Sequence, residues 1–348
     1  MGDVRMTQLS PTSTGMLSNL NTLLSRYAES MMWLARYMER IENLARLIEV
    51  TEAFVRGPDG KTVWETIVQI NSDEERFQAL HPAATEQDYI QFYITDLANP
   101  SSIKGMASAV RENARSARPL ISTEMWMHLN VFTRWVLDLD PSDIRRTGLS
   151  ALCNRIKQDC QTHTGVTEGT LYRDQAWLFY LLGRHLERSD QITRLIDTRY
   201  HTLLPCEEEV GSEIDTTQWA SVLRSAAAYH AFRRLQPVTT TPANVVGFLL
   251  KNEGFPRSLA LNLRQTDAVL AALSAHYNLR RQNYAIQERL SELRATLEDQ
   301  TAEEIIIRGL HEYMHWIQAQ IEAIQSEAAS AYWPPIEKLH VPECYVEQ

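Results

Sequence analysis

Two segments of the chain, residues 36–49 and residues 184–197, carry nearly the same pattern of arginine and acidic side chains. The first reads RYMERIENLARLIE and the second RHLERSDQITRLID, with six identical positions of fourteen. Arginine binds carboxylate and phosphate groups through paired N–H donors, and a positioned glutamate can transfer protons. The charged identities are Arg36/Arg184, Glu39/Glu187, Arg40/Arg188 and Arg46/Arg194.

On a helix, which turns by about 100° per residue, these charges share one arc and apolar residues occupy most of the other. Three interpretations are open. The arc can be a solvated face with weak intrahelical pairs, or a structural network in which the two helices exchange Arg–Glu bonds across a pseudo-twofold axis. It can also be a polar cleft whose arginines hold a carboxylate or phosphate ligand.

Further arginines occur outside these two segments. Arg111, Arg115 and Arg118 fall on one face of the segment RENARSAR, and the matching segment DAVLAALS has no arginine. Such a stripe needs anionic neighbours, either a ligand or the carboxylates of Glu39, Glu42 and Asp190. Arg257 occurs only in the second half, and we expect it in the first turn of a helix, where backbone N–H groups also favour anions.

The candidate site combines these groups. Glu39 and Glu187 are candidate general acid–base residues, and with Asn43 they are also expected to orient the arginines. The candidate ligand-binding residues are Arg36, Arg40, Asn43, Arg111, Asn113, Arg115, Arg118, Arg184, Arg188 and Arg257.

The segment 311–315 reads HEYMH, which fits the HExxH pattern of zinc peptidases on a helix. That pattern places two histidines one turn apart with a glutamate base between them, and Glu337 could supply a third ligand. Nothing else in the sequence demands a metal, so we predict no metal site and keep His311 and His315 as the weak candidates. Without a P-loop or a GxGxxG motif, we also expect no cofactor.

The composition excludes several classes of protein. The chain has 348 residues, a net charge of −10 and only 13 Gly and 13 Pro, which favours an all-α protein and disfavours binding to nucleic acid or an anionic membrane. No apolar run approaches the roughly 20 residues that span a bilayer. Cys153 and Cys160 are seven residues apart and are expected to share one buried helix face. Sparse cysteines and the lack of a signal-like apolar core predict a cytoplasmic location.

The predicted architecture is one helical-bundle domain over residues 23–345, after a flexible tail at 1–22. Its halves, about 23–145 and 148–335, match beyond the charged segments, since Trp64 aligns with Trp219, and the region from Phe92 aligns with the region from Phe248. Two diverged repeats are therefore expected. We expect surface loops at 71–87 and 205–215. The predicted helices are 22–56, 62–70, 86–97, 101–117, 122–138, 142–163, 171–203, 216–235, 242–252, 256–276, 279–298 and 302–332.

Several segments together resemble the alpha-E domain family of bacterial all-helical proteins. They are SRYAESMMWLARYMERIENLARLIEV, RENARSARPLISTEMWMHLN, LGRHLERSDQITRLID and FPRSL, and the resemblance runs from about Leu24 to Trp333. It implies a helical fold and genomic companions of two kinds, circularly permuted ATP-grasp ligases and transglutaminase-like peptidases. The family brings no established catalytic residues.

The resemblance implies an accessory or substrate-positioning subunit of an ATP-grasp-type amide or peptide ligase system. Its partners would be the ligase and an anionic peptide or amino-acid-like ligand held by the arginines. The alternatives are a stand-alone enzyme of amide chemistry that uses Glu39 or Glu187, and a zinc hydrolase that uses the HExxH segment.

Overall fold

The computed structural model describes residues 23–55, 60–203, 213–235 and 240–334, and every regular element within them is a helix. The predicted all-α class is therefore confirmed. The helices are α2 (Ser25–Val55), α3 (Gly60–Asn71), α4 (Glu74–Leu80), α5 (Glu86–Ile94), α6 (Ile103–Ser116), α7 (Thr123–Asp138), α8 (Pro141–Thr147), α9 (Leu149–Thr170), α10 (Gln175–Leu203), α11 (Glu213–Ser225), α12 (Tyr229–Leu235), α13 (Pro242–Lys251), α14 (Leu259–Tyr277), α15 (Arg280–Asp299) and α16 (Ala302–Tyr332).

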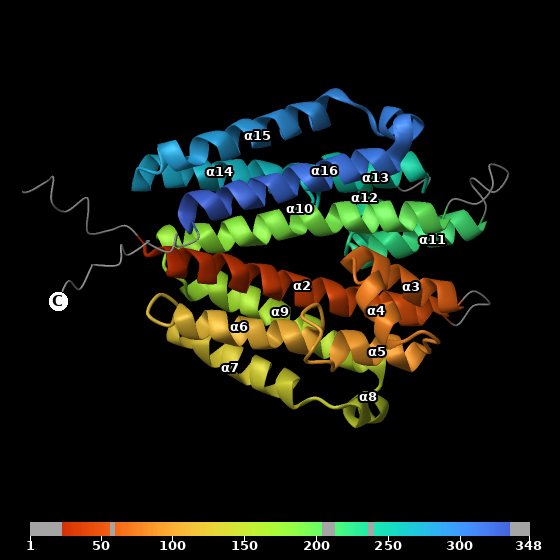
Figure 1. Ribbon diagram of the computed structural model, residues 1–348. Coiled ribbons are helices and arrows are strands. Elements are labelled where there is room, and N and C mark those ends of the chain that lie inside the picture. The colour runs from red at the N-terminus through yellow and green to blue at the C-terminus, as the bar shows by residue number, and fades with distance from the viewer. Residues whose placement is uncertain (1–22, 56–59, 204–212, 236–239, 335–348) are drawn as a thin grey trace, which may run out of the picture.

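The two charged segments lie on α2 and α10, which pack side by side through the middle of the molecule (Figure 1). The two helices run parallel: residues near the start of α2 contact residues near the start of α10, and residues further along α2 contact residues further along α10. The backbone N–H of Leu23 donates to Gln175, and Glu39 meets Arg188 further along.

Helices on two sides bury this central pair. α6, α7 and α9 lie on the side of α2, while α14, α15 and α16 lie on the side of α10 (Figure 1). Because both central helices are covered on several faces, their charged arcs cannot all point into water. Cys153 and Cys160 of α9 belong to the same core, as expected.

Gly183 allows α2 and α10 to approach closely. A Cβ atom at this position would lie 2.2 Å from the backbone carbonyl oxygen of Met32. Any larger residue would push the two helices apart, so this contact sets the spacing across which the charged side chains meet.

The starts of α6 and α14 are alike. Ser102 and Ser258 are their N-caps, and each hydroxyl accepts from a backbone N–H in the first turn. This cap places Arg257 before the helix, so our expectation that it lies in the first turn is wrong. Two-repeat ancestry stays a prediction.

Other boundaries differ from those expected. The predicted loop at 71–87 contains α4, whose Phe77 is buried in the core. The predicted helix 142–163 is divided at Gly148, whose φ of 87° ends α8, and 216–235 is divided near Ala227, whose φ is 57°. Such positive φ values interrupt a helix that periodicity alone would continue.

Some expectations concern residues that the structure leaves undescribed. The tail at 1–22, most of the loop at 205–215 and Glu337 lie outside the described residues, although Glu213 already begins α11. Within the described residues, no helix is both long enough and apolar enough to cross a membrane.

Candidate ligand-binding site

The two central helices exchange a reciprocal pair of ion pairs. Arg40 Nε on α2 donates to Glu187 Oε1 on α10 at 2.5 Å, and Arg188 Nη2 on α10 donates to Glu39 Oε1 on α2 at 2.6 Å. The matched residues of the two segments therefore bond each other across the helix interface. Glu39 is 5% and Glu187 1% exposed, so the solvated-face interpretation is wrong for them.

A second arginine of α2 completes the coordination of Glu187. Arg36 Nε donates to the other oxygen, Oε2, at 2.8 Å, and its guanidinium lies over the ring of Trp33. The matched residue Arg184 does not mirror this contact, because its Nη2 bonds Glu168 at 2.9 Å. The reciprocal arrangement is broken at this position.

Arg257 occupies the corresponding place beside α2. Its Nη2 lies 2.8 Å from Glu42 Oε1, and its Nη1 donates to Asn43 Oδ1 at 2.6 Å. Its Nη1 is also 3.6 Å from Glu39 Oε2. A residue before α14 thus links this helix to the network, and Asn43 accepts a hydrogen bond from the same arginine.

The surrounding arginines keep both buried glutamates ionised. Burial would raise the pKa of Glu39, but the charges of Arg188 and Arg257 lower it to about 2. Burial opposes ionisation of Glu187 as well, and Arg40 with Arg36 nevertheless lowers its pKa. Carboxylates so strongly held make poor proton acceptors near neutral pH, which favours a structural and orienting role over acid–base catalysis.

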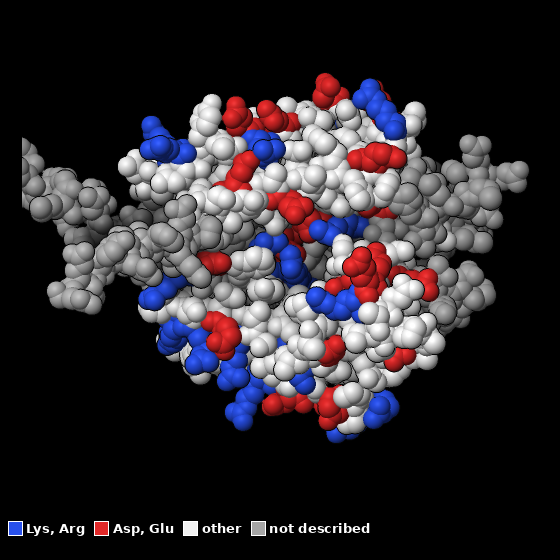
Figure 2. All heavy atoms as spheres, viewed as in Figure 1, with Lys and Arg blue, Asp and Glu red and all other residues white. Residues whose placement is uncertain are grey.

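A pocket of about 320 Å³ opens beside this network, where α2, α3 and α10 meet the turn after α11. Acidic and basic side chains gather around a hollow in the middle of the face shown in Figure 2. The charged residues that line the pocket are Arg40, Glu187, Arg188, Asp190, Arg194 and Arg257.

The remaining lining is partly apolar and partly hydrogen-bonding. The apolar wall consists of Leu44, Leu47, Ile70, Met106, Ile192, Leu195 and Ala226. The uncharged polar residues include Asn43, Asn71, Ser72, Ser101, Gln191 and Ser225. A pocket with both signs of charge and an apolar wall suits a small ligand that itself carries both kinds of group.

Two acidic residues line the pocket, Glu187 and Asp190, and the pKa of Asp190 is shifted in the opposite direction to that of Glu187. Burial and the neighbouring charge of Glu187 raise its pKa, and the ion pair with Arg194 at 2.8 Å only partly offsets them. Arg194 also donates from Nη1 to Ser72 Oγ at 3.0 Å, which ties α10 to the corner after α3.

The structure separates the predicted ligand-binding residues into three sets, of which the third is the stripe on α6. Arg40, Asn43, Arg188 and Arg257 line the pocket, while Arg36 and Arg184 do not line it and pair with Glu187 and Glu168.

The stripe on α6 does not reach the pocket. Arg111, Arg115 and Arg118 are exposed, since the opposite face of α6 packs into the core, and they do not meet the acids suggested for them. Arg115 pairs with Glu112 on its own helix, and the Asn113 side chain bonds the carbonyl of Ala109.

The sequence interpretation missed several lining residues. Arg194 carried a signal, because it matches Arg46 in the repeat, and Ser101 lies in the Pro-Ser-Ser sequence before α6. Ser72 and Ser225 come from the ends of α3 and α11 and have no signal of their own.

The histidines of the HExxH segment lie away from this pocket, on α16. Both face Asp197 of α10, with His311 Nδ1 2.6 Å from Oδ1 and His315 Nε2 3.6 Å from Oδ2. Glu312 is exposed and is not part of this group. The arrangement therefore differs from that of a zinc peptidase, in which the glutamate serves the metal site.

Fold and site together define an all-helical protein organised around two parallel helices that exchange Glu-Arg ion pairs. The chain belongs to the Alpha-E family, described as a predicted alpha-helical domain with a conserved ER motif, whose model matches residues 23–333. Glu39-Arg40 and Glu187-Arg188 are E-R pairs of this chain, and they are the residues that form the reciprocal contact.

Two curated relatives are uncharacterised proteins of Mycobacterium bovis and Mycobacterium tuberculosis. Each is 24% identical over 328 residues, which cover 87% of this chain and 36% of the relative. The chain thus spans little more than a third of the length of these relatives. No solved structure matches it.

Proposed function

We propose that the protein is an accessory, substrate-positioning subunit of an ATP-grasp-type amide or peptide ligase system. Its pocket would hold an amino-acid-like or short peptide ligand. The observation that carries the proposal is the pocket lining, which offers guanidinium groups, carboxylates and an apolar wall within about 320 Å³.

Each part of such a ligand has a counterpart in the lining. Arg194 and Arg257 provide guanidinium groups for a carboxylate, and Asp190 provides a carboxylate for an ammonium group. The apolar residues of α2 and α10 would contact the ligand side chain. The buried amide oxygen of Gln191 has no hydrogen-bond partner among the described residues, so it can accept from a ligand N–H.

The network behind the pocket supports this role. Because Glu39 and Glu187 hold Arg188 and Arg40 in place, the pocket arginines are ordered before a ligand arrives. Preorganised groups bind with a smaller loss of conformational entropy. In the two relatives the matched region is part of a longer chain, which agrees with a domain that works beside another unit.

The two enzymatic alternatives have weaker support. A stand-alone enzyme would need Glu39 or Glu187 to exchange protons, and arginines lower the pKa of both. A zinc hydrolase of the HExxH type would need Glu312 beside the metal, and it is not part of the His–Asp group.

Ligand binding can be tested by calorimetry with free amino acids and a panel of dipeptides. We expect at least one zwitterionic compound to bind, and Arg194→Ala to weaken that binding about 10-fold or more, the loss expected for a charge-assisted contact. Arg115→Ala, on the exposed face of α6, is the matched control and should bind normally. Binding by none of these compounds, or equal losses in both variants, would contradict the pocket assignment.

The ligase partnership needs a separate experiment. The chain, tagged and expressed in its native host, should co-purify with an ATP-grasp protein, and adding it should increase the ATP-dependent amide-forming rate of that protein. Amide chemistry by the purified chain without ATP or partner would overturn the accessory role and support a stand-alone enzyme.

A further inference from the structure

We propose that Asp197, His311 and His315 form a binding site for a divalent first-row transition-metal ion such as Zn²⁺. The proposal is independent of the pocket ligand. It rests on side chains from two helices that converge although they are 114 residues apart in the chain.

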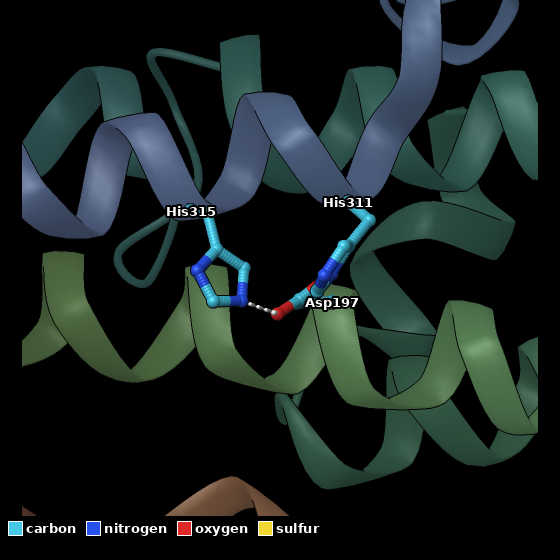
Figure 3. A group of neighbouring side chains, drawn as sticks. All are labelled: Asp197, His311 and His315. Carbon is cyan, nitrogen blue, oxygen red and sulfur yellow. Dashed lines mark hydrogen bonds and ion pairs between the residues drawn. The ribbon is translucent and has the colours of Figure 1, made fainter.

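Both imidazole rings point from α16 toward the carboxylate on α10 (Figure 3). His311 presents Nδ1 and His315 presents Nε2, and each nitrogen faces a different oxygen of Asp197. The three ligand atoms all lie within 4.8 Å of one another. Zinc binds nitrogen and oxygen ligands at about 2.0–2.2 Å, so bound ligand atoms lie about 3–4 Å apart. Small side-chain rotations would bring this group to that geometry.

The chemistry of the three ligands suits such an ion. Neutral imidazole and carboxylate bind zinc and neighbouring transition metals well, whereas Ca²⁺ and Mg²⁺ prefer sites made of oxygen alone. Two histidines one helical turn apart present both rings on one side of the helix. The carboxylate of Asp197 is 11% exposed, so it is already partly desolvated and held against α16.

A bend in α16 precedes the two histidines. Gly309 has φ 119° and ψ 97°, which interrupts the helix two residues before His311. A Cβ atom at Gly309 would lie 2.3 Å from Glu312 Oε2, so the Glu312 carboxylate lies back against the bend. Glu312, the general base of an HExxH site, therefore lies apart from the histidines, and Asp197 supplies the third ligand of this group.

Such a site would retain coordination positions for other molecules. His315 is largely exposed, with 63% of its side-chain surface accessible. Three protein ligands leave at least one position of a tetrahedral ion open, as in metal sites that bind water or a substrate group. Because a metal ion binds the unprotonated nitrogen of a neutral imidazole, His311 would carry its proton on Nε2 when Nδ1 binds the ion.

The test uses the full chain without a histidine tag, freed of metal and titrated with ZnCl₂ by calorimetry. We expect one equivalent to bind. His315→Ala and Asp197→Asn should each weaken binding by at least about 10-fold, because even residues behind the ligands typically contribute that much. His276→Ala removes an exposed histidine of α14 and should leave binding unchanged.

Circular dichroism should confirm that every variant is folded. Co²⁺ offers a second measurement, since its visible absorption reports imidazole and carboxylate coordination and should be lost in the same variants. Binding of less than one equivalent by the unmodified chain would overturn the proposal. Unchanged affinity in both His315→Ala and Asp197→Asn would overturn it as well.

Discussion

At the scale of single residues, the same charges that suggest a ligand site first hold the protein together. Glu187 accepts from Arg36 and Arg40, and Glu39 faces Arg188 and Arg257. Arg40 is partly exposed, and the other five side chains have little exposure. Isolated buried charges are expensive, so each carboxylate is needed to balance its arginines. Some residues of this network line the pocket, and the others stabilise the packing of the helices.

Replacing one of these carboxylates should destabilise the fold strongly. We expect Glu39→Gln to lower the free energy of unfolding by about 3 kcal/mol or more, because Arg188 and Arg257 remain buried without their counter-charge. Urea unfolding near neutral pH measures the change. Glu112→Gln, which removes an exposed partner of Arg115, should change it by less than about 0.5 kcal/mol. A Glu39→Gln protein as stable as the unmodified one would show that the network contributes little.

At the scale of the helices, two features govern how α2, α9 and α10 pack. One is the close contact between the backbones of α2 and α10, and the other is the burial of histidine side chains on α9 and α10. Gly183 lets α10 contact the backbone of α2. Two histidines, His163 of α9 and His185 of α10, are buried with neutral partners, Tyr180 and Asn262. Gly183 therefore acts on the contact of α10 with α2, whereas the two histidines join α9 to α10 and α10 to α14.

A methyl group at the helix crossing should therefore be costly. Gly183→Ala should destabilise the protein by about 1–3 kcal/mol, because the new Cβ overlaps the carbonyl of Met32 and α2 must move. Gly165→Ala on α9 is the opposite case, since nothing lies near its Cβ position, and it should stabilise by about 0.5–1 kcal/mol. Thermal and urea unfolding of both variants would reveal the difference in sign; equal effects would refute the close-contact explanation.

Buried histidines should make the fold sensitive to mild acid. Burial lowers the pKa of His163 to about 3 and of His185 to about 4, whereas both would titrate near 6.5 when unfolded. The unfolded chain thus takes up protons first, and stability should fall as pH drops below about 6.5, by roughly 1.4 kcal/mol per pH unit for each histidine. Glu39 also makes the protein less stable as the pH falls, but only below about pH 4.5, because its pKa is lowered from 4.5 to about 2 in the folded protein.

Urea unfolding at pH 7.5 and at pH 5.0 separates the histidines from Glu39. His163→Gln should reduce the loss of stability between these two pH values by the contribution of one buried histidine, roughly 1.4 kcal/mol per pH unit below about 6.5. His276→Ala should leave the loss unchanged. A pH dependence that is identical in all three proteins would contradict the assignment.

At the scale of the whole molecule, the two sequence halves are not separate packing units. α2 of the first half packs against α9 and α10 of the second, and Arg257 from the start of α14 bonds back to α2. Most of the charged network lies at this boundary. Neither half can bury its central helix without the other.

We therefore expect one cooperative unfolding transition for the whole chain. Fragments 1–147 and 148–348, expressed separately, should lack cooperative unfolding because each exposes the buried face of α2 or α10. Scanning calorimetry and circular dichroism measure both properties. A fragment with its own sharp transition would show that the halves are independent domains.

Much of the architecture could be predicted from the sequence. Helical periodicity identified nearly all the helices, because the spacing of apolar residues is a local property of each segment. For the paired E-R segments the sequence left three interpretations open, one of them a network between the two helices, and the ion pairs between α2 and α10 agree with that network. Boundaries at Gly148 and Ala227 were missed, because positive backbone angles leave little trace in the apolar pattern.

The sequence by itself determined the helical class, because the spacing of apolar residues is a pattern carried within single segments. Only the tertiary structure decided which charges serve the pocket. Helical periodicity defines the face on which Arg115 lies, but packing of α6 turned that face outward. Packing likewise brought Arg257 to Glu42 and Asp197 to His311. Contacts between distant segments depend on how whole helices dock, which no local pattern records.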